Sequence, residues 1–254
     1  MDNVLEQLRK LSQEINLSNR FEWDFNGDFL NSIPQVGPFI NNTNFHNLFE
    51  RNEALKFKLT EYFQNNNASD DLNFWIINQW GGIKNFKNSN KNRNKINEFR
   101  NEVRNGRLTR STFSTISSLS KLSSFWDCKN YVIYDSRVIY SLNWLILKFS
   151  EEKRYFPTPP GRSEVIAKFN IDTIIRLFHK DIIQGEDLYY SYKQAYHRYC
   201  DLMRKWSLKL WNDNYSKRRQ YPFYLEMLLF IIADKEIFED MKKCINITIK
   251  GANK

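Results

Sequence analysis

The sequence predicts a mainly α-helical protein. Gly and Pro are scarce, with 8 and 6 in 254 residues, which disfavours an all-β fold built from many tight turns. Hydrophobic residues make up 41% of the chain and aromatic residues 16%, enough for a buried core. Apolar residues recur with the 3.6-residue period of a helix over residues 4–15, 45–63, 72–79, 96–104, 111–126, 136–149, 163–178, 187–211 and 222–245.

A proline-rich segment interrupts this pattern at residues 155–162, YFPTPPGR. Three prolines and a glycine cannot continue a helix, so we expect a rigid, extended connection. It divides the chain into two predicted helical lobes, an N-terminal lobe over residues 1–154 and a C-terminal lobe over residues 163–254.

Two asparagine-rich stretches are predicted to be loops. Residues 26–44 either cover a cleft or connect two helices, and residues 85–97 are expected to form a solvated, mobile loop. A short β signal, YVIY at residues 131–134, is too isolated to predict a sizeable sheet.

The formal net charge is +9, which favours polyanionic partners. A basic surface that only aids solubility would explain the charge equally well. The distribution favours nucleic acid, because the basic residues of segments 84–110 and 198–219 are mixed with aromatic residues that can stack on bases. The candidate phosphate contacts in the first segment are Lys84, Arg107 and Arg110.

The three cysteines, Cys128, Cys200 and Cys244, are far apart and fit no metal-ligand spacing. We expect free thiols in a cytoplasmic protein, with no metal or organic cofactor implied. The N-terminal residues have an amphipathic helix pattern rather than that of a signal peptide. No window approaches the roughly 18 apolar residues that span a bilayer, so no membrane partner is expected.

The chemistry is expected in residues 120–138, SKLSSFWDCKNYVIYDSRV, and the helix that leads into them. That helix has a serine-rich face, including Ser118 and Ser120, whose small hydroxyl side chains can approach a phosphate closely. Lys121 lies on the same helix. It can contact phosphate, act as an amine nucleophile or remain a solvated surface residue.

Asp135 stands where the N-cap of the next predicted helix belongs, its carboxylate accepting the free amides of the first turn. A carboxylate fixed in this way can also stabilise a developing cation, so its structural and catalytic roles require the same placement. Arg137 follows, and it can pair with Asp135 or clamp a phosphate.

This order of features resembles the helix-hairpin-helix DNA glycosylase superfamily: a Ser-Lys helix, an aromatic-rich turn, a hydrophobic-Tyr-Asp step and an Arg-Val pair that opens another helix. It is most similar to the divergent bacterial branch of 8-oxoguanine-glycosylase-like proteins, some of which act against phages with modified DNA. The resemblance covers residues 79–149 and implies a two-lobed helical fold. Lys121 would match the family lysine that attacks the sugar carbon, and Asp135 the aspartate beside the flipped nucleotide.

Two features depart from the family pattern. The family hairpin carries glycines before the lysine, whereas residues 116–120 here read ISSLS, and only 14 residues separate Lys121 from Asp135 (135 − 121 = 14). Both departures weaken the assignment of Lys121 as a nucleophile more than that of Asp135.

The resemblance implies that the protein binds DNA, including modified phage DNA, and excises a damaged or modified base. Cleavage of the N-glycosidic bond develops positive charge on the sugar, which Asp135 would stabilise, and the base would enter an aromatic pocket. The candidate pocket residues, each of which fits a core role as well, are Trp80, Trp126 and Tyr134.

Two other functions fit the same sequence. One is a non-catalytic nucleic-acid-binding module on this scaffold, and the other is a helical interaction protein of a defence or toxin system. Glu226, within an apolar run, is assigned a structural role, with Arg137 or Arg162 as its expected partner. Gly81 and Gly82 are expected to end a helix, or to turn their amides toward phosphate.

Overall fold

The computed structural model describes residues 2–65, 69–161, 163–180 and 188–246, and these are mainly helical, as predicted. β-pairing within them is limited to one isolated bridge between Tyr155 and Tyr189. The α-helices are α1 (Asp2–Glu14), α2 (Leu17–Arg20), α3 (Gly37–Asn42), α4 (Leu48–Asn65), α5 (Asp70–Trp75), α6 (Asn90–Arg104), α7 (Arg110–Phe113), α8 (Ile116–Trp126), α9 (Ser136–Phe149), α10 (Glu164–Ala167), α11 (Ile171–Phe178), α12 (Tyr192–Leu210), α13 (Ser216–Gln220), α14 (Phe223–Ile232) and α15 (Phe238–Cys244). The 3-10 segments are η1 (Asp28–Ser32) and η4 (Asp213–Tyr215), and the π-helical turns are η2 (Ile76–Trp80) and η5 (Ala233–Ile237).

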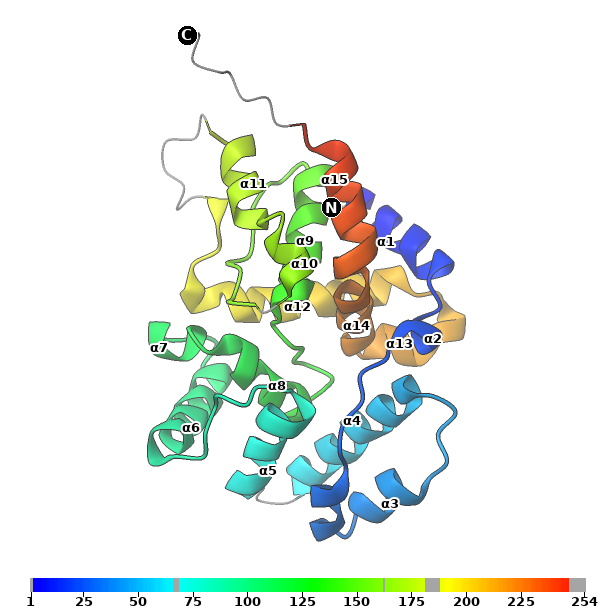
Figure 1. Ribbon diagram of the computed structural model, residues 1–254, viewed down its shortest axis with the longest axis vertical. Helices are drawn as coiled ribbons and strands as arrows, with labels where there is room; N and C mark the ends of the chain where they lie inside the picture. The colour runs from blue at the N-terminus through cyan, green and yellow to red at the C-terminus, as the bar shows by residue number, and fades with distance from the viewer. Residues whose placement is uncertain (1, 66–68, 162, 181–187, 247–254) are drawn as a thin grey trace.

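The helices are arranged in two tiers (Figure 1). In one tier, α1 packs against α9 and α12, and α9 packs against α14, so the first helix of the chain joins the C-terminal helices. In the other tier, α4, α6 and the turn η2 pack against α8. The described residues of the predicted lobe boundary, 155–161, lie beside α9 of the first tier. The division of the chain at that point stays a prediction.

The described residues of the proline-rich segment form no helix, as predicted, and neighbouring elements hold them. The Tyr155 amide donates to the Leu188 carbonyl at 2.8 Å, and the Tyr190 amide donates to the Tyr155 carbonyl at 2.9 Å. The side chain of Asn143, on α9, accepts from the Phe156 amide and donates to the Phe156 carbonyl. The segment therefore has a fixed path against α9.

Both asparagine-rich stretches contain helix that the sequence did not predict. Residues 26–44 include η1 and α3, which bury Leu30 and Ile40. In the second stretch α6 begins at Asn90, because the Ser89 hydroxyl caps the helix by accepting from the Asn92 amide. The expectation of a mobile loop over residues 85–97 is therefore wrong from residue 90 onward.

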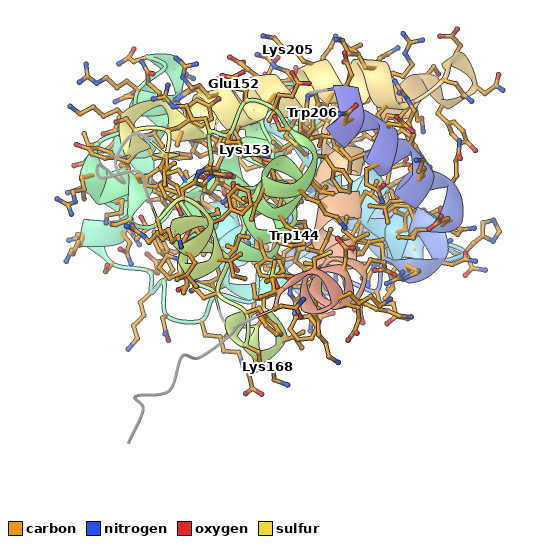
Figure 2. All side chains as sticks on the ribbon, turned by 90° about the horizontal axis from the view of Figure 1, so that it is seen from above. Trp144, Glu152, Lys153, Lys168, Lys205 and Trp206 are labelled. Atoms are coloured by element: carbon orange, nitrogen blue, oxygen red, sulfur yellow. The ribbon has the colours of Figure 1, made fainter. Side chains whose placement is uncertain are left out.

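Helix α12 shows the amphipathic character of the long helices. Lys205 extends from its exposed face, whereas Trp206 points inward and is only 3% exposed (Figure 2). Among the helices of the described residues, none has the length and apolar character that a bilayer crossing requires.

Candidate active site

A pocket of about 440 Å³ has both Lys121 and Asp135 in its wall. The parts of the chain that contribute to it include the segments before α4 and after α5, helix α8, the start of α9 and helix α14. Its lining comprises Phe21, Trp23, Trp80, Gly81, Gly82, Ile83, Ser114, Thr115, Ser117, Ser118, Lys121, Ile133, Asp135, Ser136, Arg137, Pro160, Gly161, Ser163, Glu226 and Phe230. The fold thus brings the two predicted catalytic residues to one cavity.

The extended segment at residues 131–134 leads from α8 to Asp135, and side chains bind its backbone amides. The Ile133 amide donates to Glu226 Oε2 at 3.1 Å, and the Tyr134 amide donates to Ser120 Oγ at 2.9 Å. Buried amides need such partners, because an unsatisfied one costs about 1–3 kcal/mol. Helices α8 and α14 therefore supply the bonds that a neighbouring strand would supply in a sheet.

Two tyrosines of α12 bind the carbonyls of the same segment. The Tyr196 hydroxyl donates to the Val132 carbonyl at 3.1 Å, and the Tyr199 hydroxyl donates to the Ile133 carbonyl at 2.8 Å. Both tyrosines are fully buried, and burial raises the pKa of each phenol well above its ordinary value, so both stay protonated donors. The position of Asp135, directly after this segment, is fixed from both sides of the backbone.

Asp135 is the N-cap of α9, as predicted. It has an extended backbone, and its Oδ1 accepts from the Arg137 amide at 2.9 Å. The next residue, Ser136, lies so close to Gly161 that a Cβ on the glycine would stand 2.2 Å from Ser136 Oγ. The proline-rich segment thus closes over the start of α9, at the edge of the pocket.

Lys121 is only 6% exposed, which excludes one of its three expected roles, that of a solvated surface residue. Its aliphatic chain lies against Gly81, where an added Cβ would be 2.5 Å from Lys121 Cδ. Gly82, with φ of +64°, turns the chain after η2 in a conformation that favours glycine. The glycine pair therefore ends a helix, as predicted, and also makes room for the lysine.

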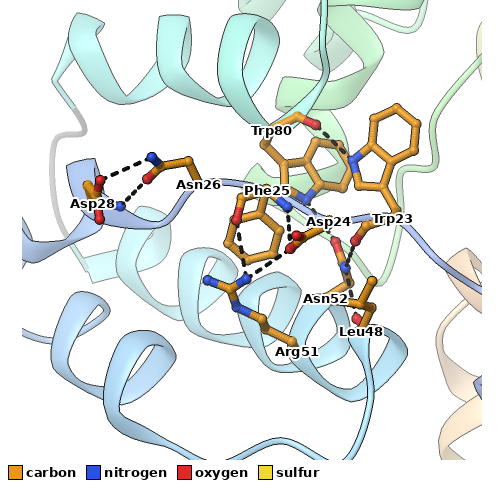
Figure 3. Close-up of polar contacts among 9 residues, drawn as sticks. All are labelled: Trp23, Asp24, Phe25, Asn26, Asp28, Leu48, Arg51, Asn52 and Trp80. Atoms are coloured by element: carbon orange, nitrogen blue, oxygen red, sulfur yellow. Dashed lines mark hydrogen bonds and ion pairs between the residues drawn. The ribbon is translucent and has the colours of Figure 1, made fainter.

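A closed ring of hydrogen bonds fixes the aromatic wall of the pocket (Figure 3). Trp23 Nε1 donates to the Trp80 carbonyl at 2.8 Å, and Trp80 Nε1 donates to Asn52 Oδ1 at 2.9 Å. Asn52 Nδ2, on α4, completes the ring by donating to the Trp23 carbonyl at 2.6 Å. The predicted pocket residue Trp80 is thus in the wall, together with Trp23.

Next to this ring of hydrogen bonds, Arg51 holds the segment that contains Trp23. Its guanidinium donates to Asp24 Oδ1 at 3.1 Å and to the Phe25 carbonyl at 3.2 Å, and it lies 4.2 Å from the centre of the Phe25 ring (Figure 3). A segment without regular secondary structure is therefore held firmly against α4.

A buried carboxyl and a buried amine lie at or behind the pocket. Burial raises the pKa of Glu226, although Lys56, the Ile133 amide and Lys121 oppose the shift. Burial also lowers the pKa of Lys56, whose Nζ donates to Ser124 Oγ at 2.8 Å and lies 4.6 Å from the centre of the Phe125 ring. Among these groups, Glu226 and Lys121 line the pocket.

Arg137 also lines the pocket, but its guanidinium pairs with another element. It lies 2.9 Å from Asp234 Oδ2 and 5.0 Å from the centre of the Phe230 ring. Its contact with Asp135 is made by its backbone amide. The expected pairing of Arg137 with Glu226 is therefore wrong, and the other expected partner, Arg162, lies outside the described residues.

Three predicted contact residues do not reach the pocket. Ser120 is fully buried, and its hydroxyl is occupied by the Tyr134 amide. Tyr134 is also fully buried and donates to the Pro157 carbonyl at 2.8 Å. Trp126 packs beside Phe99, away from the pocket lining. Ser120 and Tyr134 hold the backbone in place, and Trp126 covers the core.

The predicted basic contacts lie elsewhere on the surface. Arg107 and Arg110 line a second hollow of about 450 Å³, beside Lys193 and Tyr192. Lys84 is exposed and lines neither hollow, whereas Ser118 lines the first.

The sequence did not indicate the pocket roles of Trp23, Phe230 or Glu226. Trp23 lies in a segment without periodicity, 57 positions from the Trp80 carbonyl that it binds. Glu226 lies 93 positions from Ile133. A carboxylate within the apolar run YPFYLEMLLF was the one signal available, because such a group has to meet polar partners.

The ring of hydrogen bonds gives a stability prediction. We expect Asn52→Ala to lower the free energy of unfolding by about 2–4 kcal/mol, because it leaves the Trp80 indole N–H and the Trp23 carbonyl without their partner. Urea denaturation measures the change. The control is Asn65→Ala on the same helix, where an exposed amide donates to the Glu61 carbonyl, and it should change stability by less than about 0.5 kcal/mol. A loss below about 1 kcal/mol for Asn52→Ala would contradict the role of the ring.

The chain was compared with protein-family models, with curated proteins and with solved structures, and no match was found in any of the three. Its function is therefore inferred from the residues around the pocket.

Proposed function

We propose that the protein excises a damaged or modified base from DNA by cleaving its N-glycosidic bond. The observation that carries the proposal is that Asp135 and Lys121 line one pocket that also has aromatic walls. A volume of about 440 Å³ lies within the range of roughly 300–1,000 Å³ typical of small-molecule sites. A site of this size would hold a flipped base, on which aromatic rings can stack.

Asp135 would supply the electrostatic catalysis. The bond breaks with positive charge developing on the sugar, and a fixed carboxylate nearby stabilises that charge without having to reorganise. The cap on α9 and the bonded segment at residues 131–134 hold Asp135 in this way. Lys121 would act either as an amine that attacks the sugar carbon or as a phosphate ligand.

The second hollow would bind the DNA backbone. Arg107, Arg110 and Lys193 gather there, and cationic side chains in a concave site attract phosphate. Modified phage DNA is the substrate that the resemblance to phage-defence glycosylases suggests. The base itself would be identified by incubating the protein with genomic DNA from several sources, including phages with hypermodified bases, and analysing released bases by mass spectrometry.

Asp135→Asn tests the chemistry. We expect it to lower base release by at least about 100-fold while duplex affinity changes less than about threefold, because asparagine still caps a helix but carries no charge. The control is Asp127→Asn, which removes a carboxylate that also binds backbone amides but lies outside the pocket.

A second measurement makes this test independent of the target base. Duplexes with a cationic pyrrolidine in place of the sugar should bind the wild-type protein more tightly than duplexes with an uncharged tetrahydrofuran. Asp135→Asn should abolish the difference. Full base release by Asp135→Asn would show the assigned chemistry to be wrong, and salt-sensitive binding without any base release would indicate the non-catalytic module instead.

The basic hollow predicts how DNA affinity depends on salt. We expect the double variant Arg107→Gln/Arg110→Gln to weaken duplex binding, and to reduce the slope of log affinity against log salt by about 2. Fluorescence anisotropy at several salt concentrations measures both. The control, Lys242→Gln/Lys243→Gln on α15, removes the same charge elsewhere. Equal slopes for the two double variants would contradict a phosphate site at the hollow.

A further inference from the structure

We infer that Glu226 is the acid that protonates the leaving base, and that the site therefore acts on neutral bases. This inference rests on the proposed function and adds a second carboxyl to its chemistry. Asp135 would stabilise the sugar, whereas Glu226 would serve the base.

Glu226 has the position that this role requires. It lies on α14 in the wall of the same pocket as Asp135 and Lys121, and it is 6% exposed. The Ile133 amide, two residues before Asp135, donates to Glu226 Oε2 at 3.1 Å. One segment thus fixes both carboxyl groups relative to each other. Because Oε2 accepts this bond, an acidic proton would reside on Oε1.

Charged and titratable groups from four directions act on Glu226. Lys56 on α4, the Ile133 amide and Lys121 on α8 favour its ionised form. Asp135 at the start of α9 disfavours it. Tyr199 on α12 stays a neutral phenol, because burial raises its pKa well above the ordinary value. Burial is the largest effect on Glu226 and raises its pKa, which extends the range of pH in which it can donate a proton.

The bond to the Ile133 amide does not by itself require an acid at this position. Glutamine offers the Ile133 amide the same acceptor oxygen without the cost of burying an ionisable group. A carboxyl differs from that amide in two properties: its ionised form offsets the charges of Lys56 and Lys121, and it can give up a proton and take it back.

The step balances as follows. The N-glycosidic bond breaks, and its electron pair goes to the base nitrogen. Glu226 donates a proton to the base, either at that nitrogen or at another ring atom. The sugar becomes a cation, stabilised by Asp135, and water adds to its C1′ carbon. The proton lost by that water restores the acid form of Glu226 directly or through solvent. The products are the neutral base and an abasic sugar.

This assignment selects a class of substrate. A neutral base leaves with difficulty unless it is protonated, so Glu226 matters for it. A base that already carries a positive charge, such as 7-methylguanine, leaves without a proton, and Glu226 should not matter for it.

The test compares Glu226→Gln with the wild-type protein on two kinds of duplex. One carries the neutral base identified in the genomic digest, or 8-oxoguanine, and the other carries 7-methylguanine. Single-turnover release of the neutral base should fall by at least about 100-fold, whereas release of 7-methylguanine should stay within about threefold. The control is Glu236→Gln, which removes a half-buried carboxyl that pairs with Arg20 outside the pocket, and it should change neither rate by more than about threefold.

The wild-type protein provides a test that does not depend on how the variant folds. Its rate on the neutral base should fall about tenfold per pH unit above the raised pKa of Glu226, because the acid form is then lost. Its rate on 7-methylguanine should show no such fall. Equal losses on both duplexes, no loss on either, or identical pH profiles would overturn the inference and leave the proposed function standing. A wild-type protein that releases no base at all would overturn both.

Discussion

The candidate site depends on how a helical protein provides hydrogen-bond partners for the backbone of a non-helical segment in its core. Residues 132–134 are buried, so their amides and carbonyls need partners, and no neighbouring strand in the described residues supplies them. Side chains from α8, α12 and α14 do so instead. The segment leads to Asp135 at the start of α9, where the carboxylate caps the helix and lines the pocket.

The charged groups near the pocket impose a cost that a purely structural core would avoid. Lys56 is 1% exposed and Glu226 is 6% exposed. Burial lowers the pKa of Lys56 and raises the pKa of Glu226, so it favours the neutral form of each. Polar and aromatic neighbours reduce the cost for Lys56, through the Ser124 hydroxyl and the faces of the Phe125 and Trp80 rings. Ionisable groups with shifted pKa values that gather at a pocket are typical of functional sites.

Local patterns in the sequence predicted the local parts of this structure. The 3.6-residue period located the main helices, and the position of Asp135 before an apolar stripe identified the cap of α9. Lys121 and Asp135 were placed in one site by resemblance, and they line one pocket. Ser120 and Tyr134 were assigned to ligand contacts, but their polar groups are used within the core. Sequence pattern gives the face of a helix that is buried, and not the distant atom that a buried hydroxyl will bind.

The remaining parts of the site come from tertiary contacts between segments far apart in the chain. The pocket needs Glu226 to meet Ile133 across 93 positions, and no periodicity encodes that meeting. The same bond leaves Glu226 able to change its protonation state. Its Oε2 can accept the Ile133 amide in either protonation state, although the bond favours the ionised form, so the backbone before Asp135 can be held in both states. A proton can therefore leave Glu226 and return without displacing the carboxylate that would stabilise the sugar.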